Sequence, residues 1–129
     1  MTAFELYALM VFGHYLGDFA LQSKFIADGK NCKEPIPGVP WKQVLMAHAG
    51  IHGGLVGAAV AIAGLSHPEL LHWAIVFGVA ETAIHYRIDE GKCRKAFGWN
   101  VDQALHFLCK LAWTAGACVS AGMPILFSA

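Results

Sequence analysis

Four stretches of the sequence carry histidine and acidic side chains at intervals of four residues. They are HYLGD from His14, HAGIH from His48, ETAIHYRID from Glu81 and DQALH from Asp102. Residues four apart lie on one face of an α-helix, with Cβ atoms about 6 Å apart. Imidazole and carboxylate groups are ligands of Zn²⁺, Mn²⁺ and Fe²⁺. Each stretch therefore predicts a helix with one polar face that suits a metal ion.

Seven of these side chains are predicted metal ligands: His14, Asp18, His48, His52, His85, Asp89 and His106. The set offers nitrogen and oxygen donors and no sulfur, so Zn²⁺ is the preferred ion and Mn²⁺ and Fe²⁺ are alternatives. The donors outnumber the ligands of one tetrahedral ion. We therefore expect either two ions, or one ion surrounded by carboxylates that orient its ligands.

Three further side chains of the same stripes are predicted catalytic residues: Glu81, Asp102 and Lys110. A divalent ion with an open position activates water as a nucleophile near neutral pH, and Glu81 or Asp102 would then act as general base. Lys110, four residues after His106, would hold a phosphate or a developing oxyanion. The alternative is that Lys110 is only a counter-ion to Asp18 or Glu81. It is the single cation expected among the buried carboxylates.

The elements that carry these stripes are predicted transmembrane helices. The sequence is 57% hydrophobic and 14% charged, whereas soluble domains are about 25% charged. Apolar segments at about residues 4–27, 41–65, 68–90 and 100–127 are each near or above the roughly 20 residues that cross a bilayer. We therefore expect a single all-α domain over residues 1–129, an integral membrane four-helix bundle.

The basic residues predict the orientation of this bundle. Eight of the nine Lys and Arg residues lie in or beside the connections that follow the first and third predicted helices. By the positive-inside rule these connections are cytoplasmic and both termini face outward from the inner (plasma) membrane. A rise of about 1.5 Å per residue then places Asp18, His48, His85 and His106 about 9 to 13 Å from the cytoplasmic helix ends. The four stripes are therefore predicted to converge in the cytoplasmic half of the membrane.

The expected partners are membrane lipids and a lipid-like or phosphorylated substrate. Basic residues on the cytoplasmic side would attract anionic head groups, although topology alone also explains them: Lys24, Lys42, Arg87, Lys92, Arg94 and Lys95. A net charge of zero predicts no nucleic-acid binding. Small residues at four-residue spacing in the second helix allow close helix packing and a homo-oligomer: Gly50, Gly53, Gly54 and Gly57.

The four cysteines are Cys32, Cys93, Cys109 and Cys118, and no two of them have C-x-x-C spacing. On the predicted topology two of them face the reducing cytoplasm and two lie in the fourth helix. Because disulfides are rare in reducing compartments, we expect free thiols and no disulfide.

The motifs H-x3-D-F-x-L-Q, E-x3-H-x3-D-x2-K and D-Q-x2-H occur in that order over nearly the whole chain. This combination, with HAGIHGGL between the first two motifs, resembles the small bacterial and phage membrane proteins of domain-of-unknown-function family 3307. The resemblance implies a polytopic membrane protein with a polar core. The positions that match the pattern are His14, Asp18, Gln22, His52, Glu81, His85, Asp89, Asp102, Gln103 and His106. A looser similarity to membrane-bound metal-dependent hydrolases favours a hydrolase by analogy only.

These features predict a membrane-embedded metal-dependent hydrolase that acts on a phosphoester or ester of a lipid or membrane-associated substrate. One alternative is a metal-ion or proton transport or relay protein, but the outer segments VGAAVAIAGL and AGACVSAGMPILF are apolar and offer no polar path. The other alternative is a non-catalytic membrane accessory protein with a structural metal site. A structural ion is fully ligated by protein, whereas a catalytic ion keeps an open position.

Overall fold

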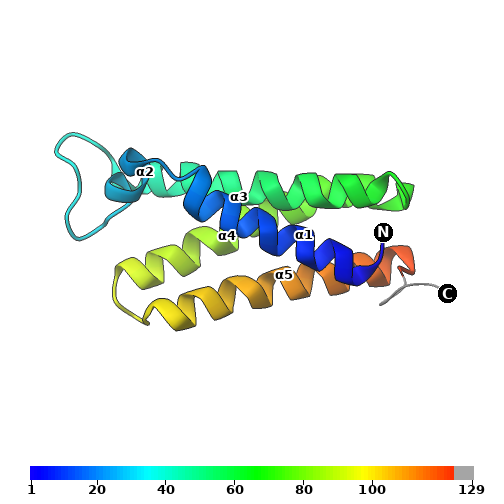
Figure 1. The fold of residues 1–129 in the computed structure, drawn as a ribbon. Coiled ribbons are helices and arrows are strands. Elements are labelled where there is room, and N and C mark those ends of the chain that lie inside the picture. The colour runs from blue at the N-terminus through cyan, green and yellow to red at the C-terminus, as the bar shows by residue number, and fades with distance from the viewer. Residues whose placement is uncertain (124–129) are drawn as a thin grey trace.

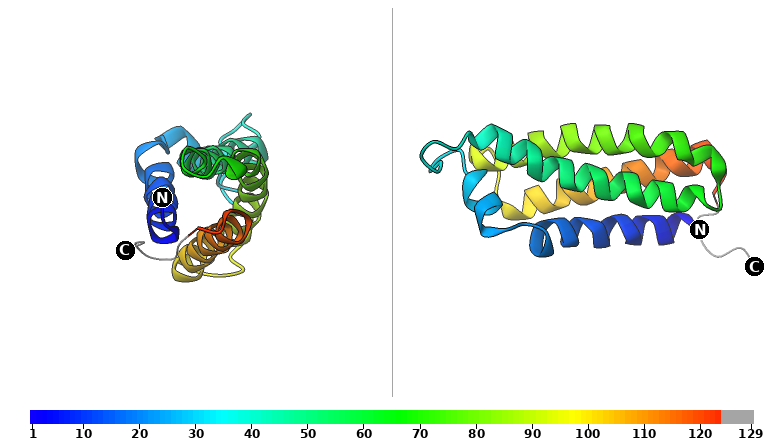
Figure 2. Two further views of the ribbon diagram at one scale, coloured as in Figure 1. Left: turned by 90° about the vertical axis from the view of Figure 1, so that its right-hand side faces the viewer. Right: turned by 90° about the horizontal axis from the view of Figure 1, so that it is seen from above.

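The computed structural model describes residues 1–123, which fold into helices with no β-strand in that range. The four longer helices are α1 (Ala3–Tyr15), α3 (Trp41–Gly64), α4 (Leu71–Cys93) and α5 (Trp99–Ala121). The short elements are the π-helical turn Leu16–Ala20, α2 (Lys24–Gly29) and the 3₁₀ turn Pro68–Leu70. Figures 1 and 2 show the longer helices side by side around a common axis. The prediction of an all-α chain is confirmed for the residues described.

The bundle has two different ends. The short helix α2, residues 30–40 and the turn between α4 and α5 lie at one end, which we call the α2 end (Figure 1). Met1 and the turn between α3 and α4 lie at the opposite end, where His67 Nε2 is 3.3 Å from the Met1 carbonyl oxygen. Neighbouring long helices therefore run in opposite directions.

The first predicted helix, residues 4–27, is interrupted in the structure. Regular α-helix ends at Tyr15, and the π turn that follows is closed by a 2.9 Å hydrogen bond from the Leu21 amide to the Leu16 carbonyl. The Ser23 hydroxyl then accepts a 3.3 Å hydrogen bond from the Ile26 amide. Such an N-cap starts a new helix. The single helix expected to residue 27 is therefore corrected to α1, a π turn and the separate helix α2.

The other three predicted helices lie close to the observed ones. The segment expected at residues 41–65 is α3, and that expected at residues 68–90 begins with the 3₁₀ turn and continues as α4 to Cys93. The last segment, expected at residues 100–127, is α5 as far as Ala121. Residues 124–127 of that prediction lie outside the described part of the chain.

The interior of the bundle changes from apolar to polar along its axis. Toward the end opposite α2, the buried core is apolar and includes Leu6, Met10, Val56, Val60, Leu70, Phe77 and Ala117. Toward the α2 end, the interior also holds a cluster of buried polar side chains: His14, His48, His52, Glu81, His85, Asp89, Asp102, His106 and Lys110. Large apolar side chains lie on the outside, among them Phe12, Ile75 and Val119.

Glycines determine how closely α3 and α4 approach each other. A Cβ atom on Gly53 would clash with the Gly78 carbonyl oxygen and the Thr82 side chain, and one on Gly78 would lie 2.9 Å from the Gly53 carbonyl oxygen. Small residues at such positions let helix backbones come together. The approach also stacks the rings of His52 and His85, whose centroids are 3.8 Å apart. Gly53, which belongs to the small-residue face predicted in the second helix, therefore packs against α4 of the same chain.

Two helices of the described chain, α3 and α5, are long and apolar enough to cross a membrane. Four such helices were predicted. The α-helical part of α1 has 13 residues, and α4 contains several charged residues: Glu81, Arg87, Asp89, Glu90 and Lys92. The passage of all four helices through a membrane therefore remains a prediction.

Cys32 and Cys93 form a disulfide, with Cα atoms 6.0 Å apart. The expectation of free thiols is therefore wrong for this pair, whereas Cys109 and Cys118 are free as predicted. The reason is tertiary, because residues 30–40 fold back onto the C-terminal end of α4. The two cysteines are 61 residues apart in sequence, so no local spacing indicates that they meet.

Candidate metal centre

The first side of the site comes from α1 and the π turn. His14 is fully buried near the end of α1, and its Nε2 lies 3.3 Å from Asp18 Oδ2 and 3.4 Å from Gln103 Oε1. Gly17 in the π turn faces His52, and a Cβ atom there would lie 2.6 Å from the Cε1 of that imidazole. The turn therefore brings Asp18 against α3 only because residue 17 has no side chain.

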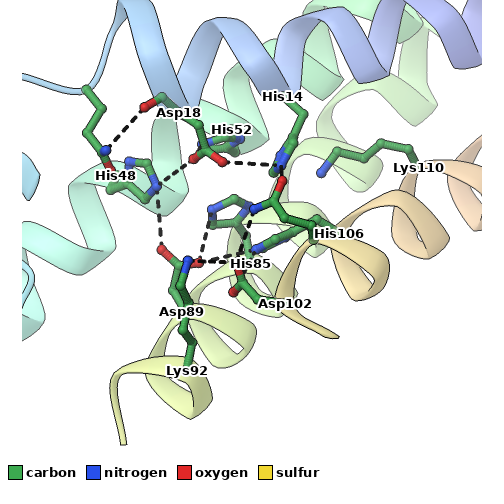
Figure 3. Close-up of polar contacts among 12 residues, drawn as sticks. His14, Asp18, His48, His52, His85, Asp89, Lys92, Asp102, His106 and Lys110 are labelled. Atoms are coloured by element: carbon green, nitrogen blue, oxygen red, sulfur yellow. Dashed lines mark hydrogen bonds and ion pairs between the residues drawn. The ribbon is translucent and has the colours of Figure 1, made fainter. Parts of the chain in front are cut away.

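Asp18 lies between histidines of two helices (Figure 3). One of its oxygens, Oδ1, is 3.4 Å from His48 Nε2 and 3.3 Å from His52 Nε2. The other oxygen faces His14. Because His48 and His52 are one turn apart on α3, both present their Nε2 atoms to the same carboxylate oxygen.

Asp89 is a second shared carboxylate. Its Oδ1 is 3.2 Å from His106 Nε2 and 3.7 Å from His85 Nε2, and its Oδ2 is 3.5 Å from His48 Nε2. The carboxylate therefore joins donors from α3, α4 and α5.

Asp102 completes the polar cluster from α5. Its Oδ1 is 3.6 Å from His106 Nε2. Its Oδ2 accepts hydrogen bonds from Lys92 Nζ at 2.8 Å and from Gln103 Nε2 at 3.1 Å. Asp102 is 1% exposed, so its negative charge is compensated by these partners and not by water.

The cluster contains three overlapping groups of donors. Within each group, the donor atoms lie within 4.8 Å of one another. They are Asp18, His48, His52 and His85; His14, His85 and His106; and Asp89, Asp102 and His106. All seven predicted metal ligands are included, together with Asp102, which was predicted as a base. The first two groups share His85 and the last two share His106, as would be expected of either two neighbouring ions or one ion surrounded by further polar side chains.

Several imidazole nitrogens of the cluster are left without a partner, which suits a divalent ion. Within residues 1–123, both ring nitrogens of His48 and of His52 and the Nε2 of His85 are buried without a hydrogen-bond partner. Such a group costs about 1–3 kcal/mol. The shared carboxylates lie 3.2–3.7 Å from imidazole nitrogens, and tetrahedral bonds of about 2.0–2.1 Å separate ligands by about 3.3–3.4 Å. An ion would therefore satisfy nitrogens that the protein leaves unpaired.

Glu81 and Lys110 lie behind His85, toward the apolar core. Lys110 Nζ donates a hydrogen bond to Glu81 Oε1, and this oxygen also lies 3.3 Å from His85 Nδ1. Trp113 Nε1 donates a 2.7 Å hydrogen bond to Glu81 Oε2. A carboxylate on the far nitrogen of a ligand histidine holds the ring in place. Lys110 is thus placed as a counter-ion to Glu81, as one of the two alternatives expected, and its action on a phosphate or oxyanion stays a prediction.

Two more lysines reach the carboxylates from the α2 end. Lys30 Nζ is 2.9 Å from Asp89 Oδ2, and Lys92 Nζ is 2.8 Å from Asp102 Oδ2. We call them the mouth lysines. The expectation that Lys110 is the single cation is therefore wrong, because the connection after α2 folds back over the site and α4 continues past Asp89.

A cavity of about 330 Å³ opens at the α2 end beside the mouth lysines. Its lining includes Asp18, Asp89 and Asp102, which we call the cavity aspartates. The rest of the lining is Phe19, Gln22, Ala27, Lys30, Lys92 and Trp99. The cluster is thus closed by protein toward the apolar core and accessible from the α2 end.

Sequence reasoning did not assign a role in the site to Lys30 or Trp113, and it treated Lys92 only as a basic residue at the membrane surface and as the last residue of a motif. Lys92 follows Asp89 by three residues and Trp113 follows Lys110 by three, so helical spacing places both on the polar faces. Lys30 lies in a connection, and no local pattern indicates its contact with α4.

The chain belongs to a family described as proteins of unknown function (DUF3307), whose sequence model matches residues 6–127. The matched range includes every residue of the candidate centre. No curated protein and no solved structure matches the chain. The resemblance to family 3307 is confirmed, and the similarity to metal-dependent hydrolases stays a prediction.

Proposed function

We propose that the chain is an integral membrane four-helix bundle whose α2 end lies at the cytoplasmic face of the inner membrane. The side chains of α5 support this proposal, since Lys110 is 1% exposed and the next residue, Leu111, is 54% exposed. A polar interior and an apolar exterior suit lipid rather than water. The length and apolar composition of α3 and α5 point the same way.

Two features disagree about the orientation. The basic residues of the α2 end favour the cytoplasm, whereas the disulfide between Cys32 and Cys93 at the same end favours an oxidising compartment. We give more weight to the basic residues, because eight of the nine in the sequence lie on this side.

We propose that the cluster binds one or two divalent ions, Zn²⁺ by preference and Mn²⁺ or Fe²⁺ as alternatives. The observation that carries this proposal is the position of Asp18 and Asp89, each between histidines of different helices. The residues that would hold the ions are His14, Asp18, His48, His52, His85, Asp89 and His106. Bound ions would supply Lewis acidity for attack by water.

The activity we propose is hydrolysis of a phosphoester or ester of a lipid or other membrane-associated substrate. The cavity at the α2 end reaches the cavity aspartates, so ions bound there would keep a side open to substrate, as catalytic ions do. Asp102 lines this cavity and is the candidate general base. Both oxygens of Glu81 are engaged, so we now assign Glu81 to positioning His85 and Lys110 to neutralising Glu81.

The alternatives have less support. A transport path would have to continue beyond Lys110, where the interior is the apolar core around Met10, Val56 and Phe77. A purely structural ion would be enclosed by protein, whereas the cluster borders a cavity of about 330 Å³.

The test is turnover by zinc-loaded protein in detergent, with p-nitrophenyl phosphate, dodecyl phosphate and p-nitrophenyl acetate as substrates. We expect a chelator to abolish hydrolysis and added zinc to restore it. Asp102→Asn should lower kcat by about 100-fold or more without loss of zinc. The control is Asp28→Asn, because Asp28 lies on α2 in an exposed ion pair with Lys24. Zinc-loaded protein that hydrolyses none of these substrates would contradict the proposed activity and leave the metal centre intact.

A further inference from the structure

The mouth lysines approach the cavity from different elements. Lys30 follows α2, and Lys92 lies near the end of α4. Each ammonium group is bonded to a carboxylate of the candidate metal centre, at 2.9 Å for Lys30 and 2.8 Å for Lys92. Their side chains are 21% and 35% exposed, and both line the cavity. The two cations are therefore accessible to a molecule that enters there.

Metal binding and these ion pairs compete for the same oxygens. Asp89 Oδ2 contacts Lys30 at 2.9 Å and lies 3.5 Å from His48 Nε2. Asp102 contacts Lys92 through one oxygen and faces His106 through the other. An ion that drew negative charge from Asp89 and Asp102 would weaken the ion pairs of these carboxylates with the mouth lysines. The ammonium groups would then lie beside the ion without a full counter-charge.

The net charge at the mouth of the cavity changes sign when an ion binds. The three cavity aspartates and the two mouth lysines leave one negative charge, since ligand imidazoles are neutral. One divalent ion turns this into one positive charge, and a second ion makes it three. Glu81 does not alter this balance, because Lys110 neutralises it. The metal-loaded mouth therefore favours an anion.

We propose that Lys30 and Lys92 bind the phosphate group of a phosphomonoester at the metal-loaded centre. The inference rests on the proposed function and narrows its substrate class, since a carboxylic ester brings no charge to this mouth. The aromatic rings at the same cavity suit an apolar alcohol on that phosphate. Trp99 is 55% exposed and Phe19 is 67% exposed, and Lys92 Nζ lies 4.3 Å from the centre of the Trp99 ring.

The experiment is calorimetric titration of inorganic phosphate into zinc-loaded protein in detergent, with the zinc content and thermal unfolding of every sample measured first. Lys30→Gln and Lys92→Gln should each weaken phosphate binding by about 10-fold or more, the effect of losing one hydrogen bond to a charged group. Both variants should keep their zinc. Lys33→Gln is the matched control, because Lys33 is an exposed lysine in the same connection as Lys30, and its phosphate affinity should equal that of the wild type.

Equal phosphate affinity in the wild type and both variants, with zinc retained, would overturn the phosphate site and leave the metal centre standing. A wild-type protein that holds no zinc would overturn the proposed function and this inference with it. If only one variant loses zinc or fails to fold, the phosphate affinity of the other variant tests the proposal, since each lysine contacts a different carboxylate.

A second titration, with dodecyl phosphate, identifies the source of the phosphate group. We expect Trp99→Ala to weaken dodecyl phosphate binding and to leave inorganic phosphate binding unchanged. Unchanged binding of both ligands by Trp99→Ala would overturn the apolar part of the proposal and indicate free phosphate or a water-soluble phosphoester.

Discussion

The imidazole rings of His52 and His85 lie stacked with their centroids 3.8 Å apart, although they belong to different helices. Both histidines are in the donor group that contains Asp18. The close approach of Gly53 and Gly78 makes the stack possible, and Glu81 Oε1 lies 3.3 Å from the Nδ1 atom of His85. The packing of α3 on α4 and the geometry of the candidate centre therefore depend on each other.

His85→Ala should lose bound metal and stability together. The substitution removes a donor shared by two groups and leaves a buried cavity beside Glu81. We expect a loss of about 2–4 kcal/mol in the free energy of unfolding and less than half of the wild-type metal content. His72→Ala, an exposed histidine of the same helix, is the control and should match the wild type. Full retention of metal by His85→Ala would remove this residue from the ligand set.

Gly17→Ala should displace a ligand without changing any ligand residue. A Cβ atom at position 17 would lie 2.6 Å from His52 Cε1, so the imidazole must move away from Asp18. We expect zinc affinity to fall by about 10-fold or more, as happens when groups that orient ligands are disturbed. The readout is competition with a chromophoric chelator. Gly50→Ala is the matched control, since a Cβ atom there has no described atom within 4 Å; an equal effect of the two changes would argue against the contact.

Lys110→Met should destabilise the protein strongly. The change removes the buried cation bonded to Glu81 and leaves that carboxylate uncompensated. Breaking a buried pair in this way costs about 3–5 kcal/mol. Adding Glu81→Gln to Lys110→Met should recover part of the loss, because position 81 then carries no uncompensated charge.

Thermal unfolding in detergent checks this prediction. Lys24→Met serves as the control, since the Lys24 side chain is 88% exposed in its pair with Asp28 and surface pairs contribute little. A Lys110 variant as stable as the Lys24 variant would contradict the buried pair.

Thiol titration should distinguish the four cysteines. In protein purified in air and then denatured without reductant, Cys109 and Cys118 should react and the Cys32–Cys93 pair should not. Reduction before denaturation should expose all four. If four thiols react without reductant, residues 30–40 are not held to α4 by a disulfide. Labelling of whole cells with a membrane-impermeant maleimide, after a membrane-impermeant reductant, would test the orientation, because a cytoplasmic α2 end protects Cys32 and Cys93 and an outward-facing one does not.

The convergence of the polar stripes was predictable because helical spacing and chain direction are local properties. His14 and Asp18 are four residues apart, as are His48 and His52, and helices that alternate in direction bring such faces to one depth. The structure places all of these side chains in the overlapping donor groups. Amphipathic spacing thus indicates which residues meet, although it does not indicate which atoms contact each other.

The differences between prediction and structure come from tertiary contacts. The connection after α2 brings Lys30 to Asp89 and Cys32 to Cys93 across about 60 residues of sequence. The end of the first predicted helix is a local exception, since the π turn after Tyr15 interrupts it and the Ser23 cap begins a new helix. The sequence also leaves the partner of Glu81 open, because this side chain could contact His85 on its own helix or a residue of the neighbouring helix. Only the packing of α5 on α4 shows that Lys110 pairs with Glu81.

The central claim is that the buried histidines and aspartates bind metal. The most direct test is elemental analysis, by plasma mass spectrometry, of protein purified in detergent without a histidine tag or chelator. We predict one or two equivalents of zinc, manganese or iron per chain, and loss of that metal from His85→Ala. A folded wild-type protein that contains no metal, and takes up no zinc on dialysis against micromolar zinc, would contradict the metal centre.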